Sequence, residues 1–221
     1  MARKKPSILG ELSGKVGDLV YKIRDGKPYV SKAPETHTLS MLPHEIDKRN
    51  IQSVNGKFAS LINKNALLKA AWGKEKKPCN CAYNKISQVN YYLCEPDHPS
   101  EKAMMTPPGG FRLEAEDIKA LPDRIEIMIR PTKLQKGEDS TAYIMILSLW
   151  NPRRKGKKTN PFEFLIPQDY ITEGNKVIFR LDKEGAMLFK KYKNKMRFLA
   201  AVTADKQNKM VRWSNTLIKD L

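Results

Sequence analysis

The sequence predicts a fold of the α+β class, mainly β, with an N-terminal β-hairpin, short helices and a C-terminal antiparallel β-sandwich of the immunoglobulin or fibronectin type. Three observations predict it: a hairpin signal near the start, helical spacing of apolar residues in the middle, and a series of strand-like runs after them. We expect a hairpin arm at 1–32, a linker and helical region at 33–109, and the sandwich domain at 110–221.

The segment SGKVGDLVYKIRDGKPYV, residues 13–30, has the pattern of a β-hairpin. Asp25-Gly26 between two β-rich runs is a strong turn signal, because a type I′ turn needs positive φ at both central residues. With Arg24 and Lys27 as the closing pair, one face of the hairpin is basic with a tyrosine and the other is apolar. The apolar face comprises Leu19, Tyr21, Ile23 and Val30. A lone hairpin is marginal in water, so we expect this face to bind the rest of the chain or another molecule.

After a proline-containing linker, the hydrophobic period changes to that of helices. Apolar residues recur at three-to-four spacing between about His44 and Asn63, which predicts an amphipathic helix. The runs ALLKAAWGK from Ala66 and NCAYNKISQVNYYL from Asn80 predict two more helical pieces. The middle of the chain is therefore expected to be helical.

The breaker-rich stretch 95–110, with four prolines and two glycines, is the clearest boundary in the sequence. Beyond it, short runs with strand-type alternation or β-branched and aromatic content recur every ten to fifteen residues. These runs are GFRLEA, RIEIMIRP, TAYIMILSLW, FEFLIP, KVIFRL, RFLAAVTA and MVRWSN. The intervening segment DKEGAMLFKKYKNK is expected to form a helical turn. Such strands suit a sandwich.

Three segments together resemble an uncharacterised domain family common in Bacteroidota. They are the opening G-x-L-S-G-K-V-G-D-L-V-Y with its D-G-K-x-Y-V, the helical middle with Asn80 and Asn84, and the closing RFLAAVTADKQNKMVRWSN. The resemblance covers nearly the whole chain and implies an N-terminal hairpin, short helices and a β-sandwich. Members of that family have no established activity, and some are encoded near mobile elements. The C-x-C pair and a basic segment of this sequence depart from the family pattern.

The composition indicates a partner of opposite charge. The chain has 41 Lys and Arg against 24 Asp and Glu, a formal net charge of +17, which favours nucleic acid or another polyanion. The alternative is a lysine-rich but otherwise ordinary surface. No apolar run approaches the roughly 18 residues needed to cross a bilayer, so we expect no membrane partner. The start lacks the apolar region of a secretion signal, so we expect synthesis in the cytoplasm and, for an assembly protein, incorporation in a particle.

Two basic segments are candidate nucleic-acid contacts. The first, NPRRKGKKTNP, is framed by two Asn-Pro turns and is expected to protrude as a loop. The second, FKKYKNKMR, mixes cations with Phe189 and Tyr192, a combination that single-strand binders use, although alternation favours a buried Phe189. The candidate residues are Arg153, Arg154, Lys155, Lys157 and Lys158 in the first segment, and Lys190, Lys191, Lys193 and Lys195, followed by Arg197, in the second.

The three cysteines lie close together, which raises a zinc hypothesis. Cys79, Cys81, Cys94 and His98 form C-x-C-x12-C-x3-H, four ligand types that zinc accepts. The first spacing is tighter than in the usual zinc knuckle, and free thiols on a helix and its flanks are the favoured explanation. We therefore expect no metal site and no cofactor, and keep a small zinc-binding module as an alternative.

No catalytic set of residues can be assembled from the sequence. It contains no G-x-S-x-G, no phosphate-loop motif and no H-E-x-x-H, and its three histidines are His37, His44 and His98. We expect a non-enzymatic structural or assembly protein, such as a subunit of a phage-like multi-copy particle, that docks through the apolar face of its hairpin. The alternative is a basic accessory protein that makes sequence-independent phosphate contacts.

Overall fold

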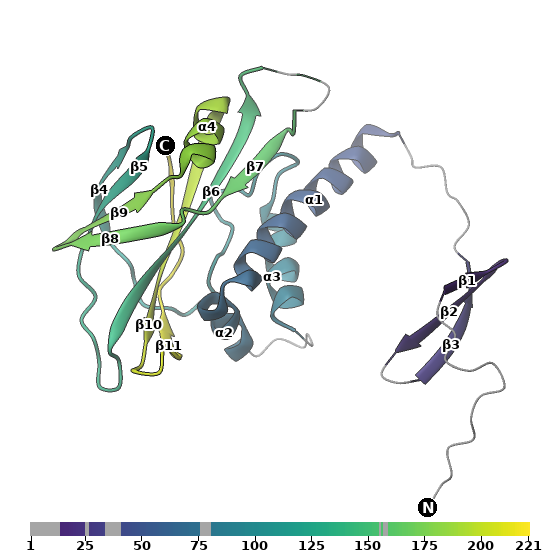
Figure 1. The fold of residues 1–221 in the computed structure, drawn as a ribbon, viewed down its shortest axis with the longest axis horizontal. Helices are drawn as coiled ribbons and strands as arrows, with labels where there is room; N and C mark the ends of the chain where they lie inside the picture. Colours follow the sequence, from purple (N-terminus) through teal and green to yellow (C-terminus); the bar gives the residue numbers. More distant parts are fainter. Residues whose placement is uncertain (1–13, 25–26, 34–40, 76–80, 155, 157–158) are drawn as a thin grey trace, which may run out of the picture. The chain divides into compact units, whose positions relative to one another are not determined.

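A computed structural model describes residues 14–24, 27–33, 41–75, 81–154, 156 and 159–221. By its internal contacts the chain divides into two compact units, Met1–Met41 and Leu42–Leu221. The helical region and the sheets that follow it belong to the same unit. Figure 1 shows the elements of both units.

The first unit contains a small antiparallel sheet in the order β1-β2-β3. Its strands are β1 (Gly14–Val16), β2 (Leu19–Arg24) and β3 (Lys27–Lys32). The predicted hairpin register is confirmed, with Arg24 opposite Lys27 and Tyr21 opposite Val30. The strand β1 was not expected from the sequence; it pairs with β2 through a turn in which Gly17 has φ +56°. Glycine accommodates that left-handed conformation without the steric cost of a Cβ.

The second unit begins with the predicted helices. They are α1 (Pro43–Lys64), α2 (Ala66–Lys74), α3 (Ala82–Asn90) and the short 3-10 helix η1 (Tyr91–Leu93). Asn65 ends α1 and caps α2, because its side-chain oxygen accepts hydrogen bonds from the backbone N–H groups of Leu67 and Leu68. The buried Lys85 of α3 donates to the carbonyl of Glu75 at 2.6 Å and so satisfies the end of α2.

Two antiparallel sheets follow. The central sheet has the order β11-β10-β6-β7, with β12 also paired to β10, and the outer sheet has the order β4-β5-β9-β8. The central strands are β6 (Ser140–Pro152), β7 (Phe162–Leu165), β10 (Tyr192–Ala204), β11 (Met210–Trp213) and β12 (Leu217–Asp220). The outer strands are β4 (Ala115–Ala120), β5 (Arg124–Ile129), β8 (Asp169–Glu173) and β9 (Lys176–Arg180). The expected helical turn is α4 (Lys183–Lys191), capped by Asp182.

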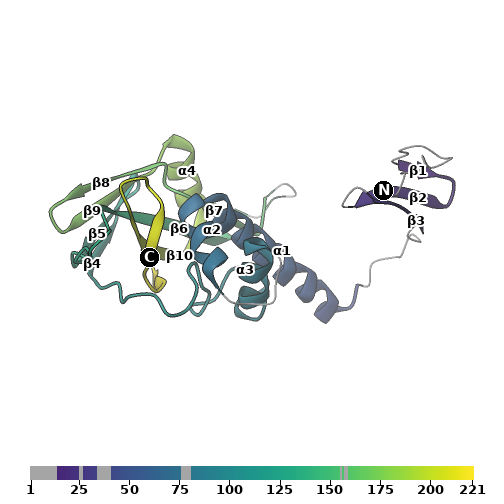
Figure 2. The same cartoon turned by 90° about the horizontal axis from the view of Figure 1, so that it is seen from below.

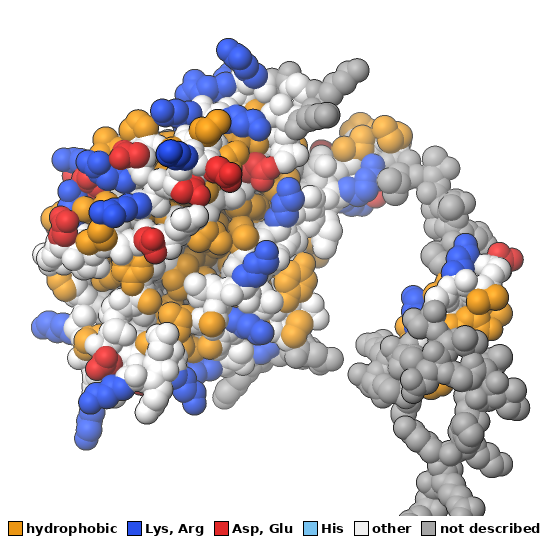
Figure 3. Space-filling model, viewed as in Figure 1, with side chains coloured by type: hydrophobic (Ala, Val, Ile, Leu, Met, Phe, Trp, Pro, Cys, Tyr) orange, Lys and Arg blue, Asp and Glu red, His pale blue; other side chains and the backbone are white. Residues whose placement is uncertain are grey.

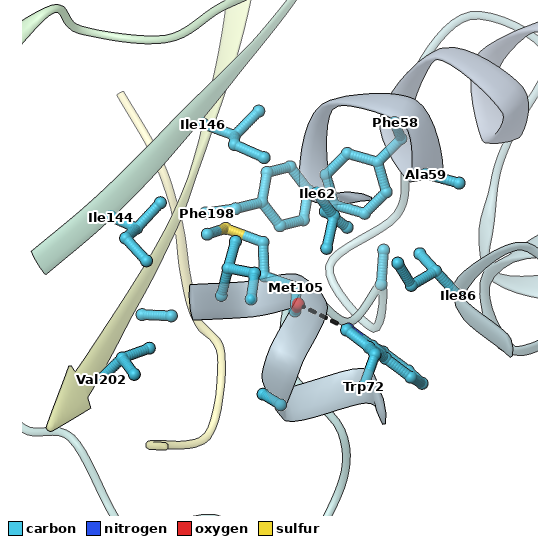
Figure 4. Close-up of a cluster of buried hydrophobic side chains, with 14 of the residues drawn as sticks. Phe58, Ala59, Ile62, Trp72, Ile86, Met105, Ile144, Ile146, Phe198 and Val202 are labelled. Carbon is cyan, nitrogen blue, oxygen red and sulfur yellow. Dashed lines mark hydrogen bonds between the residues drawn. The ribbon is translucent and has the colours of Figure 1, made fainter. Parts of the chain in front are cut away.

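The second unit has three layers, with the helices α1–α3 on one face of the central sheet and the outer sheet on its other face (Figures 1 and 2). Alternate residues of β6 and β10 therefore enter two different cores. Phe198 and Ile146 pack against the helices, whereas Leu147 and Leu199 pack against the outer sheet. In the first core, Trp72 donates its indole N–H to the carbonyl of Met105 at 2.9 Å (Figure 4).

The predicted α+β, mainly β class is confirmed, and the immunoglobulin or fibronectin type stays a prediction. One expected strand is wrong, because GFRLEA forms only an isolated bridge from Phe111 to Ser214 and β4 starts at Ala115. Gly110 lies so close to β11 that an added Cβ would be 2.6 Å from the carbonyl oxygen of Trp213. The segment therefore crosses the end of β11 and does not join a sheet there. The strands β8 and β12 were not expected from the sequence either.

At the β6 start, an ion pair joins Glu138 to Arg212. Arg212 donates from Nη2 to Glu138 Oε2 at 2.8 Å and also from Nε to Oε1. Thr203 Oγ1 donates to the same carboxylate at 2.8 Å. The guanidinium lowers the pKa of Glu138 from its ordinary 4.5 to about 2. This carboxylate therefore ties the β5–β6 loop to β10 and β11 as an anion.

Replacement of Phe198 by Ala tests the first core. The ring is fully buried, with its centroid 5.0 Å from that of Phe58, so we expect a loss of about 3–5 kcal/mol in the free energy of unfolding. Chemical denaturation monitored by circular dichroism measures this loss. The control is Met187→Ala on α4, where the side chain is 72% exposed, with an expected change within about 0.5 kcal/mol. Equal effects of the two substitutions would contradict the assigned packing.

The Glu138 pair predicts acid sensitivity. Because the pKa of Glu138 is depressed in the folded state, its stabilising effect is complete above about pH 4.5 and is lost as the pH falls towards 2. We expect Glu138→Gln to be less stable than the wild type at pH 7, with the difference shrinking between pH 4.5 and 2. Urea denaturation at a series of pH values measures it, with the exposed Asp139→Asn as the control. A pH-independent difference would refute the ionic origin.

Candidate functional site

The hairpin unit has two chemically different faces. The register places Val16 opposite Leu19 and Tyr21 opposite Val30, and paired residues of antiparallel strands share a face. Val16, Leu19 and Val30 are 64%, 43% and 49% exposed. Among the described residues, the predicted apolar face is therefore exposed at Leu19 and Val30 and extended by Val16, whereas Tyr21 is half-buried. Ile23 pairs with Pro28 in the backbone, but its side chain lies outside the described part of the structure.

The opposite face of the hairpin unit is polar and basic. Lys15 lies opposite Val20, and Lys22 lies opposite Tyr29, which is 41% exposed. Of the hairpin residues that the structure describes, none is buried. The described part of this small sheet therefore contains no buried core.

A second candidate site lies in the Leu42–Leu221 unit, where the structure brings the two basic segments together. Antiparallel pairing of β6 with β10 sets Pro152 opposite Tyr192, so the residues after β6 meet the end of α4. The backbone N–H of Arg153 donates to the carbonyl of Lys191 at 2.9 Å, and its Nε donates to that of Lys190 at 3.1 Å. Lys and Arg side chains gather at this end of the unit (upper part of Figure 3). We call this region the basic end.

The candidate nucleic-acid residues differ in accessibility. The side chains of Arg153, Arg154, Lys190, Lys191 and Lys193 are exposed, and that of Lys195 is half-buried. Lys155, Lys157 and Lys158 lie outside the described residues. The favoured burial of Phe189 is confirmed, and Tyr192 is buried in the second core as well, so neither ring is available to stack on bases. The basic end therefore offers cations for phosphate contact without these rings.

A pocket of about 360 Å³ opens at the basic end. The β4–β5 turn, the end of α4, the start of β10 and Arg153 form its walls. Lys195 lines it with its ammonium 4.8 Å from the centre of the Phe189 ring. Burial, together with the nearby positive charge of Arg153, lowers the pKa of Lys195. The pocket thus combines three cations, Arg153, Lys190 and Lys195, with apolar residues, and no Asp or Glu is found among the described residues that line it.

Arg197 is the candidate residue whose burial was not expected from the sequence. The sequence groups it with exposed residues, as the last cation of FKKYKNKMR, yet its side chain is fully buried. Its position between Met196 and Phe198, at the start of the longest apolar run of β10, is the signal for burial. Burial lowers its pKa to about 10, so the guanidinium keeps its charge at neutral pH.

The cysteine and histidine residues do not form a metal centre in the described part of the chain. Cys94 is buried against Val54 and Phe162, and burial raises the pKa of its thiol to about 12. Cys81 is exposed at the start of α3, and Cys79 lies outside the described residues. His98 stacks on Trp150 with ring centres 4.1 Å apart. A protonated thiol is a poor zinc ligand, so this geometry does not favour the zinc hypothesis.

One further pocket, of about 430 Å³, lies beside Trp150 and contains Asp97, whose carboxylate is 2.6 Å from His98 Nδ1. The contact between Asp97 and His98 joins sequence neighbours. Thr159, which carries a hydroxyl group, lines the same pocket. Its hydroxyl accepts the backbone N–H of Gly156 at 3.2 Å, which fixes the loop. Asp97 therefore lines this pocket, whereas His98, stacked on Trp150, is not among its lining residues.

Comparison with protein-family models, with curated proteins and with solved structures gave no match. The resemblance to the Bacteroidota family stays a prediction. Among the helices of the described ranges, none is long and apolar enough to span a membrane.

Proposed function

We propose that the protein is a non-enzymatic assembly protein of a multi-copy, phage-like particle, whose hairpin docks through its apolar face on a neighbouring copy of the same chain. The observation that carries the proposal is the exposure of Val16, Leu19 and Val30 on one face of a sheet without buried residues in its described part. Covering a Leu or Val side chain contributes about 1.5–3 kcal/mol. Folding of the hairpin and docking would then stabilise each other.

The edge strand β8 is the surface we assign to the neighbouring copy. It lies at the edge of the outer sheet, all five of its residues are exposed, and Ile171 is 37% exposed. Its ends carry Asp169 and Glu173, which complement the lysines of the hairpin. An exposed sheet edge with unpaired backbone groups accepts an added strand or a covering element. This charge match favours a second copy as the occupant.

A second function, sequence-independent binding of nucleic acid, is favoured by the convergence of the two basic segments. Arg153 contacts Lys190 and Lys191 through the backbone, so exposed cations separated by almost 40 residues in sequence share one surface. Such clusters bind phosphates through counterion release, without reading bases. The two functions are compatible, because the residues of the basic end differ from those of the hairpin and of β8.

Docking is tested by the pair of substitutions Leu19→Ser and Val30→Ser in the full chain. We expect the wild type to associate with rising concentration and this double variant to associate on the order of 100-fold more weakly, because both substitutions remove apolar area from the interface. Sedimentation velocity over a concentration series measures it, starting from the monomer mass of 25.3 kDa.

The matched control carries two similar substitutions on the opposite face, Val20→Ser and Tyr29→Ser, and should associate like the wild type. Ile171→Lys on β8 should weaken association as the Leu19/Val30 variant does. A wild type that stays monomeric at the highest concentration would contradict the proposal. So would an equal loss of association in the Leu19/Val30 variant and in the Val20/Tyr29 control. Association that is insensitive to Ile171→Lys would overturn the assignment to β8.

Nucleic-acid binding is tested by the triple variant Arg154→Gln, Lys191→Gln and Lys193→Gln. We expect the slope of log affinity against log salt for duplex DNA to decrease by about 0.9 for each phosphate that the variant no longer neutralises. Fluorescence anisotropy between low and physiological salt measures the slope. The control, Lys133→Gln with Lys136→Gln and Lys206→Gln, changes the net charge equally at the other end of β6 and β10. Equal slopes for the two triple variants would show that the basic end has no special role.

A further inference from the structure

The pocket of about 430 Å³ beside Trp150 contains hydrogen-bonding groups without partners among the described residues. The side chains of Asn151 and Asn194 line it, are exposed, and make no hydrogen bond to another described residue. The indole N–H of Trp150 likewise has no acceptor in the described part of the chain, whereas that of Trp72 donates to the carbonyl of Met105. Each carboxamide offers two donors and an acceptor. The pocket is therefore equipped to bind a ligand that carries both donors and acceptors.

The pocket is largely preformed. Asn194 lies directly opposite Trp150 in the β6–β10 pair. His98 stacks on the indole with the two ring planes 2° apart, and Asp97 Oδ1 lies 2.6 Å from His98 Nδ1. Asp97 lines the pocket, and its Oδ2 has no partner among the described residues. Because these contacts fix the groups in advance, little free energy is lost in ordering them when a ligand binds.

The basic end adjoins this pocket along both of the strands that form it. Arg153 and Arg154 directly follow the residues of β6 that line the pocket. Lys193 and Lys195 are the chain neighbours of Asn194. Successive side chains of a strand point to opposite sides, so Asn194 faces the side of the helices, and Lys195 faces the outer sheet and lines the other pocket. A ligand that contacts both the amides and the cations must therefore pass round the ends of β6 and β10.

The charges around the pocket identify the part of the ligand that enters it. The carboxylate of Asp97 would repel a phosphate, so an uncharged group enters the pocket while a negatively charged backbone lies on the cations outside. A neutral sugar would use the amides but not the cations. A nucleobase suits the polar groups, because an asparagine amide pairs with the donor and acceptor of adenine and a carboxylate accepts from the amino group of cytosine.

We propose that the pocket beside Trp150 receives one unpaired base of a single-stranded nucleic acid, whose phosphates contact the exposed cations of the basic end. The inference rests on the nucleic-acid function proposed above and adds the class of nucleic acid. In a single strand a base can turn outward and present its edge to a protein, whereas the bases of a duplex are stacked and paired. The volume of the pocket is in the usual range of sites for small molecules. The pocket thus selects a single strand over a duplex.

Three labelled DNA ligands test the proposal by fluorescence anisotropy with the full chain: a short single strand, the duplex of the same sequence, and a strand of equal length without bases. We expect the wild type to bind the single strand more tightly than the duplex, although a surface that contacts only phosphates favours the duplex for its higher charge density. The strand without bases should bind about tenfold more weakly than the ordinary strand, because it cannot fill the pocket. Equal affinity for the ordinary strand and the strand without bases would overturn the site, as would tighter binding of the duplex.

The pocket variant, Asn151→Gly with Asn194→Ala, removes both carboxamides without changing the net charge, and glycine accepts the φ of 56° at position 151. We expect about tenfold weaker binding of the single strand, with the duplex affinity and the salt slope unchanged, since no phosphate contact is lost. The matched control, Gln207→Ala with Asn208→Gly, removes two exposed amides at the other end of β10, where Asn208 has a φ of 58°, and should bind like the wild type. Normal single-strand binding by the pocket variant, or equal losses in the variant and the control, would overturn the site.

The pocket and the nucleic-acid function fail in different ways. Absence of salt-dependent binding of either form of DNA by the wild type would refute the nucleic-acid function as a whole. Salt-dependent binding that is the same with and without bases, and the same in the pocket variant, would refute only the pocket. The comparison of DNA ligands on the wild type needs no substitution, so it decides the question if the pocket variant does not fold.

Discussion

The long antiparallel pair of β6 and β10 is the constraint on which the rest of the Leu42–Leu221 unit depends. The two strands are thirteen residues each and pair from Tyr192–Pro152 to Ala204–Ser140. Helices cover one face of this pair and the outer sheet covers the other, so each strand supplies side chains to two cores. The same pairing sets the basic end at one end of the strands and the Glu138–Arg212 pair at the other. The packing of the two cores, the pocket at the basic end and the position of the Glu138–Arg212 pair therefore all depend on the register between β6 and β10.

Much of this fold was predictable, because the relevant signals are local. The Asp25-Gly26 signal in the sequence predicted the hairpin register, and the spacing of apolar residues between His44 and Asn63 predicted α1. Burial on both faces explains why the second half of β10 is a continuous apolar run and not an alternating one. The strand β8 was missed because all five of its residues are exposed, which leaves no apolar pattern. At GFRLEA, the close approach of Gly110 to Trp213 replaces sheet pairing, and that tertiary contact has no signal in sequence.

The sites were predictable only as separate parts. Sequence identified the apolar hairpin face and two basic segments, but it contains no information that β6 pairs with β10. That pairing joins Arg153 to Lys190 and creates the pocket. Nor did composition distinguish Arg197 from the exposed cations beside it, since a guanidinium is ordinarily on the surface. The chemistry of the basic end thus arises from long-range topology.

Native-state hydrogen exchange measures most directly whether β6 and β10 unite the two cores. Strands buried on both faces exchange only through global unfolding, and elements packed on them share that free energy when the unit is cooperative. The structure predicts that amides in the middle of β6 and β10, of α1 and of β5 exchange with one common free energy, while those of the hairpin exchange faster. A lower free energy for α1 or for β5 than for β6 and β10 would show that the cores unfold separately and would contradict this account.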